Sequence, residues 1–429
     1  MALGVTAAAY ARAVAALDSV AWRGIMPGLE RTRALLAALG NPHVGLHGAL
    51  VAGTNGKGSV CTTVDSVCRA AGYRSVLLTS PHLISYCERI VRDGSPITES
   101  EFGALIARVG AAAEALPEEL QPTGFEVLTA AGILVAREAD AEVLVCEVGL
   151  GGRLDSTNVL DLGVATVTNV ALDHQDLLGE TIPEIAREKA AIIKPGNRAV
   201  TAATEPGLTA VRARAAEVGA SLSVVGIDVP FTGHSTGMRG VALDTLFDGR
   251  PVSLQAPLRG AFQVANIATA VAVCDALRAT GIAIDAGAVV RGCESVRWPG
   301  RMDWIAGEPP LLIDGAHNPA GMAAMVSSAR ELIGGRRCVA VFGVMRNKDV
   351  RSMAARLAEL TREIVVTAPA VERATPPADL AWLFDPPAEV ATGVRSALHR
   401  ARHLAGREGV VVVCGSLYLA GEVLELLRV

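Results

Sequence analysis

The segment Val51-Ala52-Gly53-Thr54-Asn55-Gly56-Lys57-Gly58-Ser59-Val60 joins a predicted strand to a predicted helix. Residues 47–52 are apolar enough for a buried strand, and residues 60–71 have the pattern of a helix that ends at Gly72. Glycines let a backbone approach a phosphate closely, and the first turn of a helix points N–H groups at it. The segment is therefore predicted to bind a phosphate group.

The spacing within this segment differs from the common P-loop pattern. That pattern has a glycine where this chain has Val51, and a serine or threonine where it has Gly58. A glycine turn without a ligand is the alternative explanation. The run Gly-Lys-Gly-Ser favours a nucleotide phosphate site, in which Lys57 supplies charge to the outer phosphates and the Ser59 hydroxyl can ligate Mg²⁺.

Length and composition indicate a globular chain of two or three domains. It has 429 residues, of which 51% are hydrophobic and 19% charged. The net charge of −5 argues against nucleic-acid binding, and no apolar run reaches the roughly 20 residues of a membrane span. The eight cysteines are scattered, as reduced core thiols are. We expect a cytoplasmic monomer with small-molecule partners, no nucleic acid and no membrane.

Lysine is rare in this chain. Of 39 basic side chains, four are lysines, at Lys57, Lys189, Lys194 and Lys348. Lysine differs from arginine because its charge is compact and its amine can titrate or be modified. The four positions are therefore candidates for a specific role.

Polar side chains follow several predicted strands. Glu147 interrupts the apolar run 142–149 near its C-terminal end, and His174 follows strand 163–170. Asp314 ends strand 310–314, and His317 follows it. In an open parallel sheet such positions face the ligand crevice. A carboxylate in an apolar strand is costly unless it is paired or bound to metal, so Glu147 is predicted to bind a metal rather than to be a satisfied edge carboxylate. For His174, chemistry alone favours zinc or a proton shuttle, because Mg²⁺ prefers oxygen.

Eight stretches, in order, resemble the Mur ligase superfamily, and most closely its folate branch of dihydrofolate synthases and folylpolyglutamate synthases. The resemblance runs from about residue 28 to the end, with a gap near 197–258. The stretches are Gly53–Ser59, Ser80-Pro81-His82-Leu83 with Glu88-Arg89-Ile90, Glu147–Asp155, Leu172-Asp173-His174, Glu188-Lys189-Ala190, Asp314–Pro319, Phe342–Asp349 and Gly415–Leu419. Ala191 stands where the family has glycine.

The resemblance implies roles for individual residues. Binding of ATP is implied for Gly53, Thr54, Asn55, Gly56, Lys57, Gly58, Ser59, Asn266, Arg301, Asp314 and His317. Two Mg²⁺ ions are implied, held by Ser59, Glu147, His174 and a carbamylated Lys189. Catalytic roles fall to Lys57, Lys189, His174 and Arg301, and binding of the folate substrate to Ser80, His82, Arg89, Arg153 and Asp155.

The predicted fold class is α/β with two domains. Residues 1–296 are expected to form an ATP-binding domain around a P-loop-type parallel sheet, with residues 197–258 as a small appended antiparallel layer. Residues 297–429 alternate strands and helices, as in a smaller Rossmann-like domain. The run Arg297-Trp298-Pro299-Gly300-Arg301 is the expected hinge.

The implied reaction joins a carboxylate to the amine of L-glutamate through an acyl phosphate, with release of ADP and phosphate. The acceptor is dihydropteroate, the glutamate tail of a reduced folate, or both. One alternative is a cell-wall Mur ligase acting on a UDP-sugar peptide, although the phosphate loop follows helices directly rather than a nucleotide-sugar domain. The other is a nucleotide switch, since Asn347-Lys348-Asp349 resembles a guanine-reading motif with its aspartate one residue early.

Overall fold

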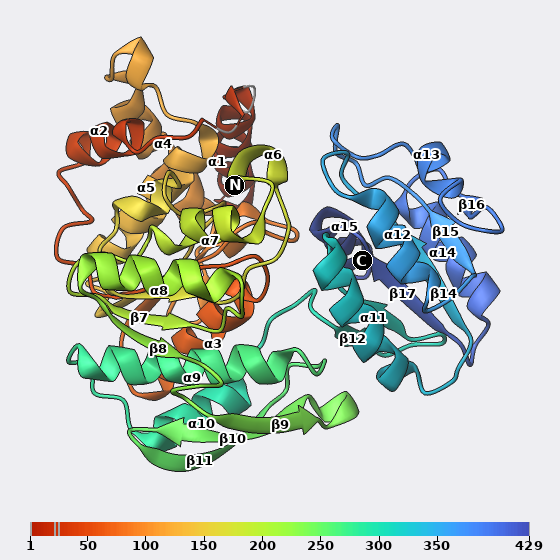
Figure 1. Ribbon diagram of the computed structural model, residues 1–429. Helices are drawn as coiled ribbons and strands as arrows, with labels where there is room; N and C mark the ends of the chain where they lie inside the picture. Colours follow the sequence, from red (N-terminus) through yellow and green to blue (C-terminus); the bar gives the residue numbers. More distant parts are fainter. Residues whose placement is uncertain (1, 21–22, 25, 429) are drawn as a thin grey trace.

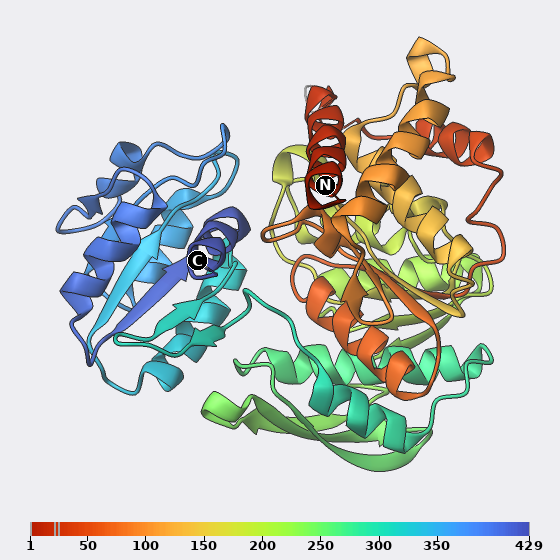
Figure 2. The ribbon, with the colours of Figure 1, turned by 180° about the vertical axis from the view of Figure 1, so that it is seen from behind.

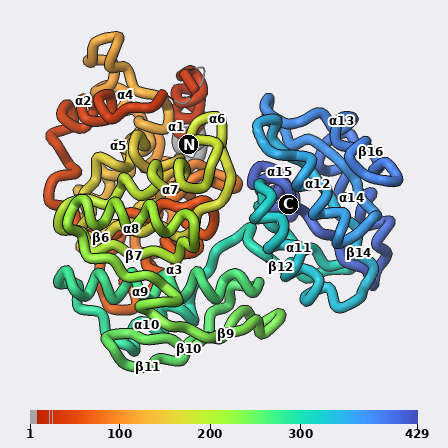
Figure 3. The backbone as a smooth tube through the Cα atoms, viewed as in Figure 1, coloured from red at the N-terminus to blue at the C-terminus, as the bar shows by residue number. Residues whose placement is uncertain are grey.

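The computed structural model describes residues 2–20, 23–24 and 26–428, which form two α/β domains side by side (Figure 1). Residues 1 and 429, the outer ends of the two predicted domains, lie outside the described residues. The chain passes from the first domain to the second between α10 (Ala286–Ser295) and β12 (Asp303–Ile305) (Figure 3). That connection contains the run 297–301 that was expected to be the hinge.

The first domain is built on an eight-stranded sheet with the order β4-β3-β2-β5-β1-β6-β7-β8. Strands β2, β5, β1, β6, β7 and β8 are parallel, and β3 and β4 extend one edge in antiparallel fashion. The strands are β1 (Gly48–Ala52), β2 (Ser75–Leu78), β3 (Ile90–Arg92), β4 (Ser95–Pro96), β5 (Val143–Glu147), β6 (Gly163–Val167), β7 (Arg198–Thr201) and β8 (Ser221–Val224).

Both faces of this sheet are covered by helices, which is why its central strands are apolar throughout. In β1, Leu50 and Ala52 point into the core shared with α2, α4 and α5, whereas Ala49 and Val51 point into the core shared with α3, α9 and α10. The parallel arrangement places the carboxyl ends of β1, β5 and β6 at one edge of the sheet.

The prediction for residues 197–258 was wrong in its first half. Strands β7 and β8, joined by α8 (Gly207–Val218), extend the large sheet in parallel. Only β9 (Phe231–Ser235), β10 (Val241–Phe247) and β11 (Arg250–Ala256) form the separate antiparallel sheet, within the described residues. Strand β8 lies at the edge of the large sheet and is half exposed, so its polar residues resemble those of a small surface layer.

The second domain has a six-stranded sheet with the order β12-β13-β17-β14-β15-β16, seen from behind in Figure 2. Strand β12 is antiparallel to β13, and the others are parallel, with helices and apolar cores on both faces. The further strands are β13 (Leu311–Ile313), β14 (Cys338–Phe342), β15 (Ile364–Val366), β16 (Glu389–Val390) and β17 (Val410–Cys414).

The remaining helices connect these strands. In the first domain they are α1 (Ala2–Ser19), α2 (Glu30–Ala38), α3 (Lys57–Ala70), α4 (Glu99–Glu114), α5 (Gly124–Glu138), α6 (Gln175–Leu178), α7 (Ile182–Ala190) and α9 (Gln263–Ala279). In the second they are α11 (Pro319–Ile333), α12 (Val350–Ala358), α13 (Pro377–Ala381), α14 (Val394–Ala405) and α15 (Leu417–Leu426). Across the described residues, no helix is both long and apolar enough to cross a membrane.

Candidate active site

The phosphate loop lies between β1 and α3, as its sequence predicts. Gly56 caps α3 with a φ of 82°, a left-handed conformation that glycine adopts without strain. A Cβ atom on Gly56 would lie 2.3 Å from Asn266 Oδ1, and one on Gly53 would lie 1.8 Å from Thr168 Oγ1. The close packing of Asn266 and Thr168 against the loop therefore leaves room only for glycine at these two positions.

Residues that follow β6 hold the loop in place. Thr168 Oγ1 and Asn169 Nδ2 donate to the carbonyl oxygen of Asn55 at 2.7 and 3.0 Å, and Asn169 Oδ1 accepts from the Asn55 N–H at 2.9 Å. Thr54 Oγ1 accepts from the N–H of Ala171 at 3.0 Å. Sequence reasoning missed Thr168 and Asn169, although their position at the carboxyl end of a strand was an available signal.

Two of the four lysines meet at the start of the loop. The ammonium groups of Lys57 and Lys189 each donate to the carbonyl oxygen of Gly53 at 3.2 Å. Lys57 comes from the first turn of α3 and Lys189 from the last turn of α7. Burial and the nearby charge of Lys57 lower the pKa of Lys189 to about 7.

Glu147 is buried at the end of β5, and its Oε2 accepts from the N–H of Ser80 at 3.1 Å. Burial raises the pKa of its carboxyl group, and the positive charges of Lys57, Arg301 and Arg89 act against that increase. The carboxylate therefore faces cations from both domains and has one backbone hydrogen bond.

The second domain contributes Arg301, Asp314 and His317. Both oxygens of Asp314 accept backbone N–H groups, from Met302 at 2.9 Å and from Ala316 at 2.8 Å. His317 Nδ1 lies 2.9 Å from the carbonyl oxygen of Gly315, and burial lowers the pKa of its imidazole to about 4. Asp314 thus shapes the loop that presents Arg301 and His317.

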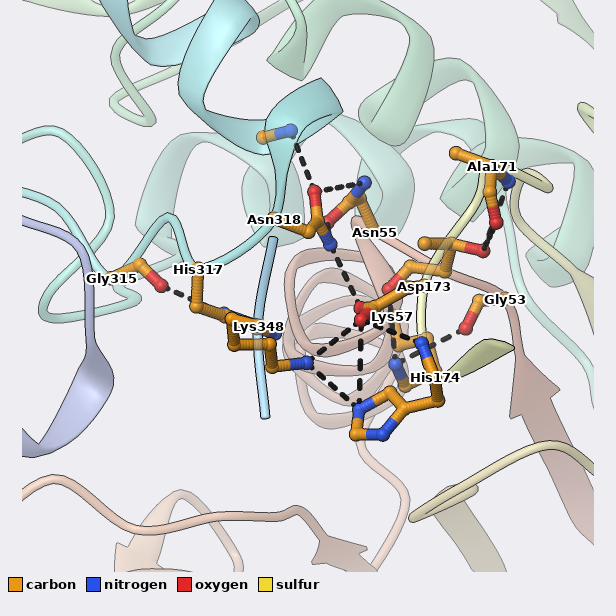
Figure 4. A network of polar contacts seen from close by, with 12 residues as sticks. Gly53, Asn55, Lys57, Ala171, Asp173, His174, Gly315, His317, Asn318 and Lys348 are labelled. Carbon is orange, nitrogen blue, oxygen red and sulfur yellow. Dashed lines mark hydrogen bonds and ion pairs between the residues drawn. The ribbon is translucent and has the colours of Figure 1, made fainter. Parts of the chain in front are cut away.

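A network of polar contacts joins the two domains at the phosphate loop (Figure 4). Lys348 Nζ lies 2.8 Å from Asp173 Oδ1 and 2.9 Å from His174 Nε2. Asn318 Nδ2 donates to Asp173 Oδ2 and to Asn55 Oδ1, both at 3.0 Å. Burial raises the pKa of Asp173, but Lys348 and His174 outweigh it and the pKa falls to about 2. Asp173, Asn318 and Lys348 were not predicted as site residues; the rarity of lysine was the signal for Lys348.

All residues predicted to bind nucleotide or metal line one cavity of about 590 Å³ between the domains. These are Gly53, Thr54, Asn55, Gly56, Lys57, Gly58, Ser59, Glu147, His174, Lys189, Asn266, Arg301, Asp314 and His317. In the cavity wall, Asn266 is oriented by Gln263, whose Oε1 accepts from Asn266 Nδ2 at 2.8 Å.

A second cavity of about 370 Å³ adjoins the first and shares Ser80, Pro81, Gly149, Leu150, Gly151, Leu178 and Tyr418 with it. Four of the residues predicted to bind the folate substrate line it, namely Ser80, Arg89, Arg153 and Asp155. The carboxylate of Asp155 is occupied by the N–H groups of Leu150 and Thr157 at 2.8 and 3.0 Å, and Arg153 pairs with Glu188 at 2.9 Å.

His82 does not line either cavity. Its Nδ1 accepts from Arg89 Nε at 2.8 Å, and its ring packs against Tyr86 with the ring centroids 4.3 Å apart. Burial and the charge of Arg89 lower the pKa of His82 to about 3, so the imidazole is neutral and can accept this hydrogen bond. The structure thus places His82 behind Arg89 rather than on the cavity wall.

Two family models match the chain: the Mur ligase middle domain over residues 51–274 and the Mur ligase glutamate ligase domain over residues 300–417. The dihydrofolate synthase/folylpolyglutamate synthase of Bacillus subtilis is 32% identical over 428 residues, which cover 94% of this chain and 96% of that protein. The chain belongs to the folylpolyglutamate synthase/dihydrofolate synthase family of Mur ligases.

Solved structures of this family share the fold. The folylpolyglutamate synthase of Mycobacterium tuberculosis, complexed with ADP and AMPPCP, matches with a TM-score of 0.92 at 30% identity over 98% of both chains. Escherichia coli FolC in complex with DHPP and ADP matches with a TM-score of 0.88 at 31% identity over 98% of this chain and 97% of that one. A bifunctional folylpolyglutamate synthase/dihydrofolate synthase with Mn, AMPPNP and L-glutamate bound matches with a TM-score of 0.86 at 30% identity over 98% of both.

Some relatives in this family are longer. A probable bifunctional folylpolyglutamate synthase/dihydropteroate synthase of Halobacterium salinarum is 37% identical over 407 residues, which cover 93% of this chain. The chain spans about half of that protein, 49% of its length. The motif Asn347-Lys348-Asp349, which resembles a guanine-binding motif, contributes to helix capping in this chain. The side chain of Asp349 caps α12 by accepting from the N–H of Ser352.

Proposed function

We propose that this protein is an ATP-dependent ligase that joins L-glutamate to dihydropteroate, to the glutamate tail of a reduced folate, or to both. The observation that carries the proposal is the pair of adjoining cavities, one lined by the phosphate loop and the other by Arg89, Arg153 and Phe125. The two share a wall, so a carboxylate of a substrate in the second cavity can reach the end of a nucleotide in the first. The relatives bound to ADP, DHPP and L-glutamate support this assignment.

In the proposed reaction, a carboxylate oxygen of the folate substrate attacks the γ-phosphorus of ATP. The bond from that phosphorus to the β–γ bridging oxygen breaks, and ADP leaves. The amine nitrogen of glutamate then attacks the carbonyl carbon of the acyl phosphate. The bond from that carbon to the phosphate oxygen breaks, phosphate leaves, and the nitrogen gives up a proton. Phosphoryl transfer depends on positioning and on neutralising charge, and Lys57 and Arg301 supply positive charge from the two sides of the cavity.

Ser59 and Glu147 are suited to hold a divalent metal, because both bring oxygen atoms to the cavity and Mg²⁺ prefers oxygen ligands. No group of three or more His, Cys, Asp or Glu side chains gathers into a metal site in the part of the chain that the structure describes. When bound, the metal neutralises charge on the phosphates. A metal ligated by His174 Nε2 would have to displace Lys348 Nζ, which lies 2.9 Å from that atom.

We propose that Lys189 is carbamylated and holds a second metal ion. Its side chain is 4% exposed, lines the cavity and has an amine with a pKa lowered to about 7, so the neutral amine that adds CO₂ is available near neutral pH. A carbamate exchanges the buried cation for an anion that a metal can offset. Its carbonyl carbon would give a ¹³C signal in protein prepared with labelled bicarbonate, and Lys189→Arg would lack it.

The second domain, from residue 297, is proposed to close over the acyl phosphate and to shield it from water. The hinge run at 297–301 and the contribution of Arg301, Asp314 and His317 to the cavity support this role.

The test is ADP release by the purified protein with Mg²⁺, ATP and glutamate, with dihydropteroate in one reaction and a reduced folate in another. Turnover with dihydropteroate alone identifies a dihydrofolate synthase, turnover with folate alone a tail-extending synthase, and turnover with both a bifunctional enzyme. A folded protein that binds ATP and turns over neither substrate would refute the proposal.

A further inference from the structure

The carboxylate of Asp173 makes two of the polar contacts between the two domains. Its Oδ1 lies 2.8 Å from Lys348 Nζ, and its Oδ2 accepts from Asn318 Nδ2 at 3.0 Å. Asp173 follows β6 in the first domain, whereas Lys348 and Asn318 belong to the second. The side chains of Asp173 and Lys348 are 10% and 9% exposed, so the two charges depend on each other for compensation.

Asn318 connects this ion pair to the phosphate loop. Its amide nitrogen donates to Asn55 Oδ1 at 3.0 Å as well as to Asp173 (Figure 4). Its amide oxygen caps α11 by accepting from the N–H of Gly321 at 2.8 Å. The amide nitrogen of Asn318 therefore donates to two residues of the first domain, Asn55 and Asp173, while its amide oxygen holds the side chain against α11.

Asn55 is itself part of the loop that faces the nucleotide. Its backbone N–H and carbonyl are bonded to Asn169, and its side chain points to Asn318. Two hydrogen bonds join Asn55 to Asn318, from Asn318 Nδ2 to Asn55 Oδ1 at 3.0 Å and from Asn55 Nδ2 to Asn318 Oδ1 at 3.4 Å. Through them, a change of the loop on binding phosphate would alter the position of the second domain, and a change in that position would alter the loop. A further hydrogen bond between the domains, from Ser235 Oγ to Glu331 Oε1 at 2.8 Å, lies at an exposed site away from the loop.

We propose that Asn318 and Asp173 are positioning residues that lock the second domain onto the phosphate loop, so that nucleotide binding and domain docking stabilise each other. This inference rests on the proposed function in one respect, which is that the nucleotide is ATP. Because coupling is reciprocal, docking strengthens nucleotide binding by the same factor by which nucleotide strengthens docking, so a variant that weakens docking also weakens nucleotide affinity, by at most that factor.

Asn318→Asp is the sharpest variant. The aspartate keeps an oxygen that can cap α11, loses both amide donors, and places a second carboxylate against Asp173. The matched control is Glu331→Gln, which changes the exposed contact between the same two domains. We expect Asn318→Asp to increase the radius of gyration measured by small-angle X-ray scattering and to weaken binding of a non-hydrolysable ATP analogue, measured by calorimetry, about tenfold. Glu331→Gln should match the wild type in both.

The thermal unfolding temperature of each variant shows whether the substitution destabilises the fold itself, which distinguishes a loss of domain docking from a loss of folding. A second pair of variants, Asp173→Asn and Lys348→Met, tests the ion pair independently, and the double variant should lose no more affinity than the worse single one. Wild-type scattering together with wild-type nucleotide affinity in Asn318→Asp would overturn the proposal. Failure of the wild type to bind the ATP analogue would instead refute the proposed function, and the scattering comparison without nucleotide would still decide whether Asn318 docks the domains.

Discussion

Lys57 and Lys189 direct their ammonium groups at the same atom, the carbonyl oxygen of Gly53, each at 3.2 Å. Lys57 is half-buried and also donates to the carbonyl oxygen of Thr54 at 3.3 Å, whereas Lys189 is buried, and its pKa falls to about 7 through burial and the charge of Lys57. An unmodified, protonated Lys189 is therefore expected to destabilise the folded state.

Lys189→Met should abolish turnover and stabilise the protein in buffer free of CO₂ and metal. The pKa of Lys189 is lower in the folded state than its ordinary value of 10.5, so folding expels a proton between about pH 7 and pH 10.5 and buries the charged amine below about pH 7. The penalty is complete below about pH 7 and disappears as the pH approaches 10.5. At pH 7 we expect a gain of about 4 kcal/mol in the free energy of unfolding, which shrinks to about 1 kcal/mol by pH 10. Urea denaturation at several pH values measures it.

Arg187→Met is the matched control for this series. It removes the same charge from an exposed position on the same helix, α7. Its effect on stability should be small and should not vary between pH 7 and pH 10. A stability difference for Lys189→Met that is equally flat across this range would contradict the buried-cation explanation.

Glu147→Gln should weaken metal binding while leaving the fold intact. Burial raises the pKa of the Glu147 carboxyl, so its ionised form costs stability above the ordinary glutamate pKa, and the neutral amide removes that cost. We expect the Mn²⁺ affinity measured in the presence of an ATP analogue to fall at least tenfold. Glu142→Gln, an exposed change just before the same strand, should leave the affinity unchanged.

Gly58→Ala should destabilise the protein, because the added Cβ would lie 2.5 Å from the ring of Trp298. Overpacking of this kind costs about 1–3 kcal/mol. Gly110→Ala, in the interior of α4 with nothing within 4 Å of the added atom, should instead stabilise by about 0.5–1 kcal/mol. Denaturant unfolding of the two variants compares them directly; equal stabilities would show that Trp298 moves aside without cost.

Arg89→Ala should raise the KM for the folate substrate more than His82→Ala does. Arg89 lines the second cavity, whereas His82 acts on the substrate only by accepting the hydrogen bond from Arg89 Nε. We expect roughly a hundredfold rise for Arg89→Ala, the loss of a charge-assisted contact, and a rise of under tenfold for His82→Ala. Steady-state kinetics with the folate substrate varied measures both, and a larger effect at His82 would show that its imidazole reaches the substrate.

Sequence patterns predicted most of the features that are formed by residues close together in the chain. The strand, glycine loop and helix around Lys57 are consecutive in the chain, so their phosphate site could be foreseen from residue order and the steric freedom of Gly56. The polar ends of strands β5 and β6 pointed to one crevice for the same reason, since neighbouring parallel strands end at one edge.

Contacts between distant segments could not be foreseen. The sequence pattern misplaces β7 and β8 in a surface layer for two reasons. Strand β8 is an edge strand, which buries fewer side chains, and the parallel partner of β7, strand β6, lies about 30 residues away in sequence. The motif that contains His82 predicts contact with the substrate, whereas in the structure His82 contacts Arg89. A sequence motif does not indicate which of its side chains faces a cavity and which one supports a neighbouring side chain.

Residue types and their local order therefore determined the two α/β domains and the chemistry of the phosphate loop, since glycine conformation and helix N–H groups act over a few residues. The meeting of Asp173, Asn318 and Lys348 was decided only by tertiary structure. Asp173 is 145 residues from Asn318 and 175 from Lys348, and it meets them only when packing of both domains buries an ionic group that must then be compensated.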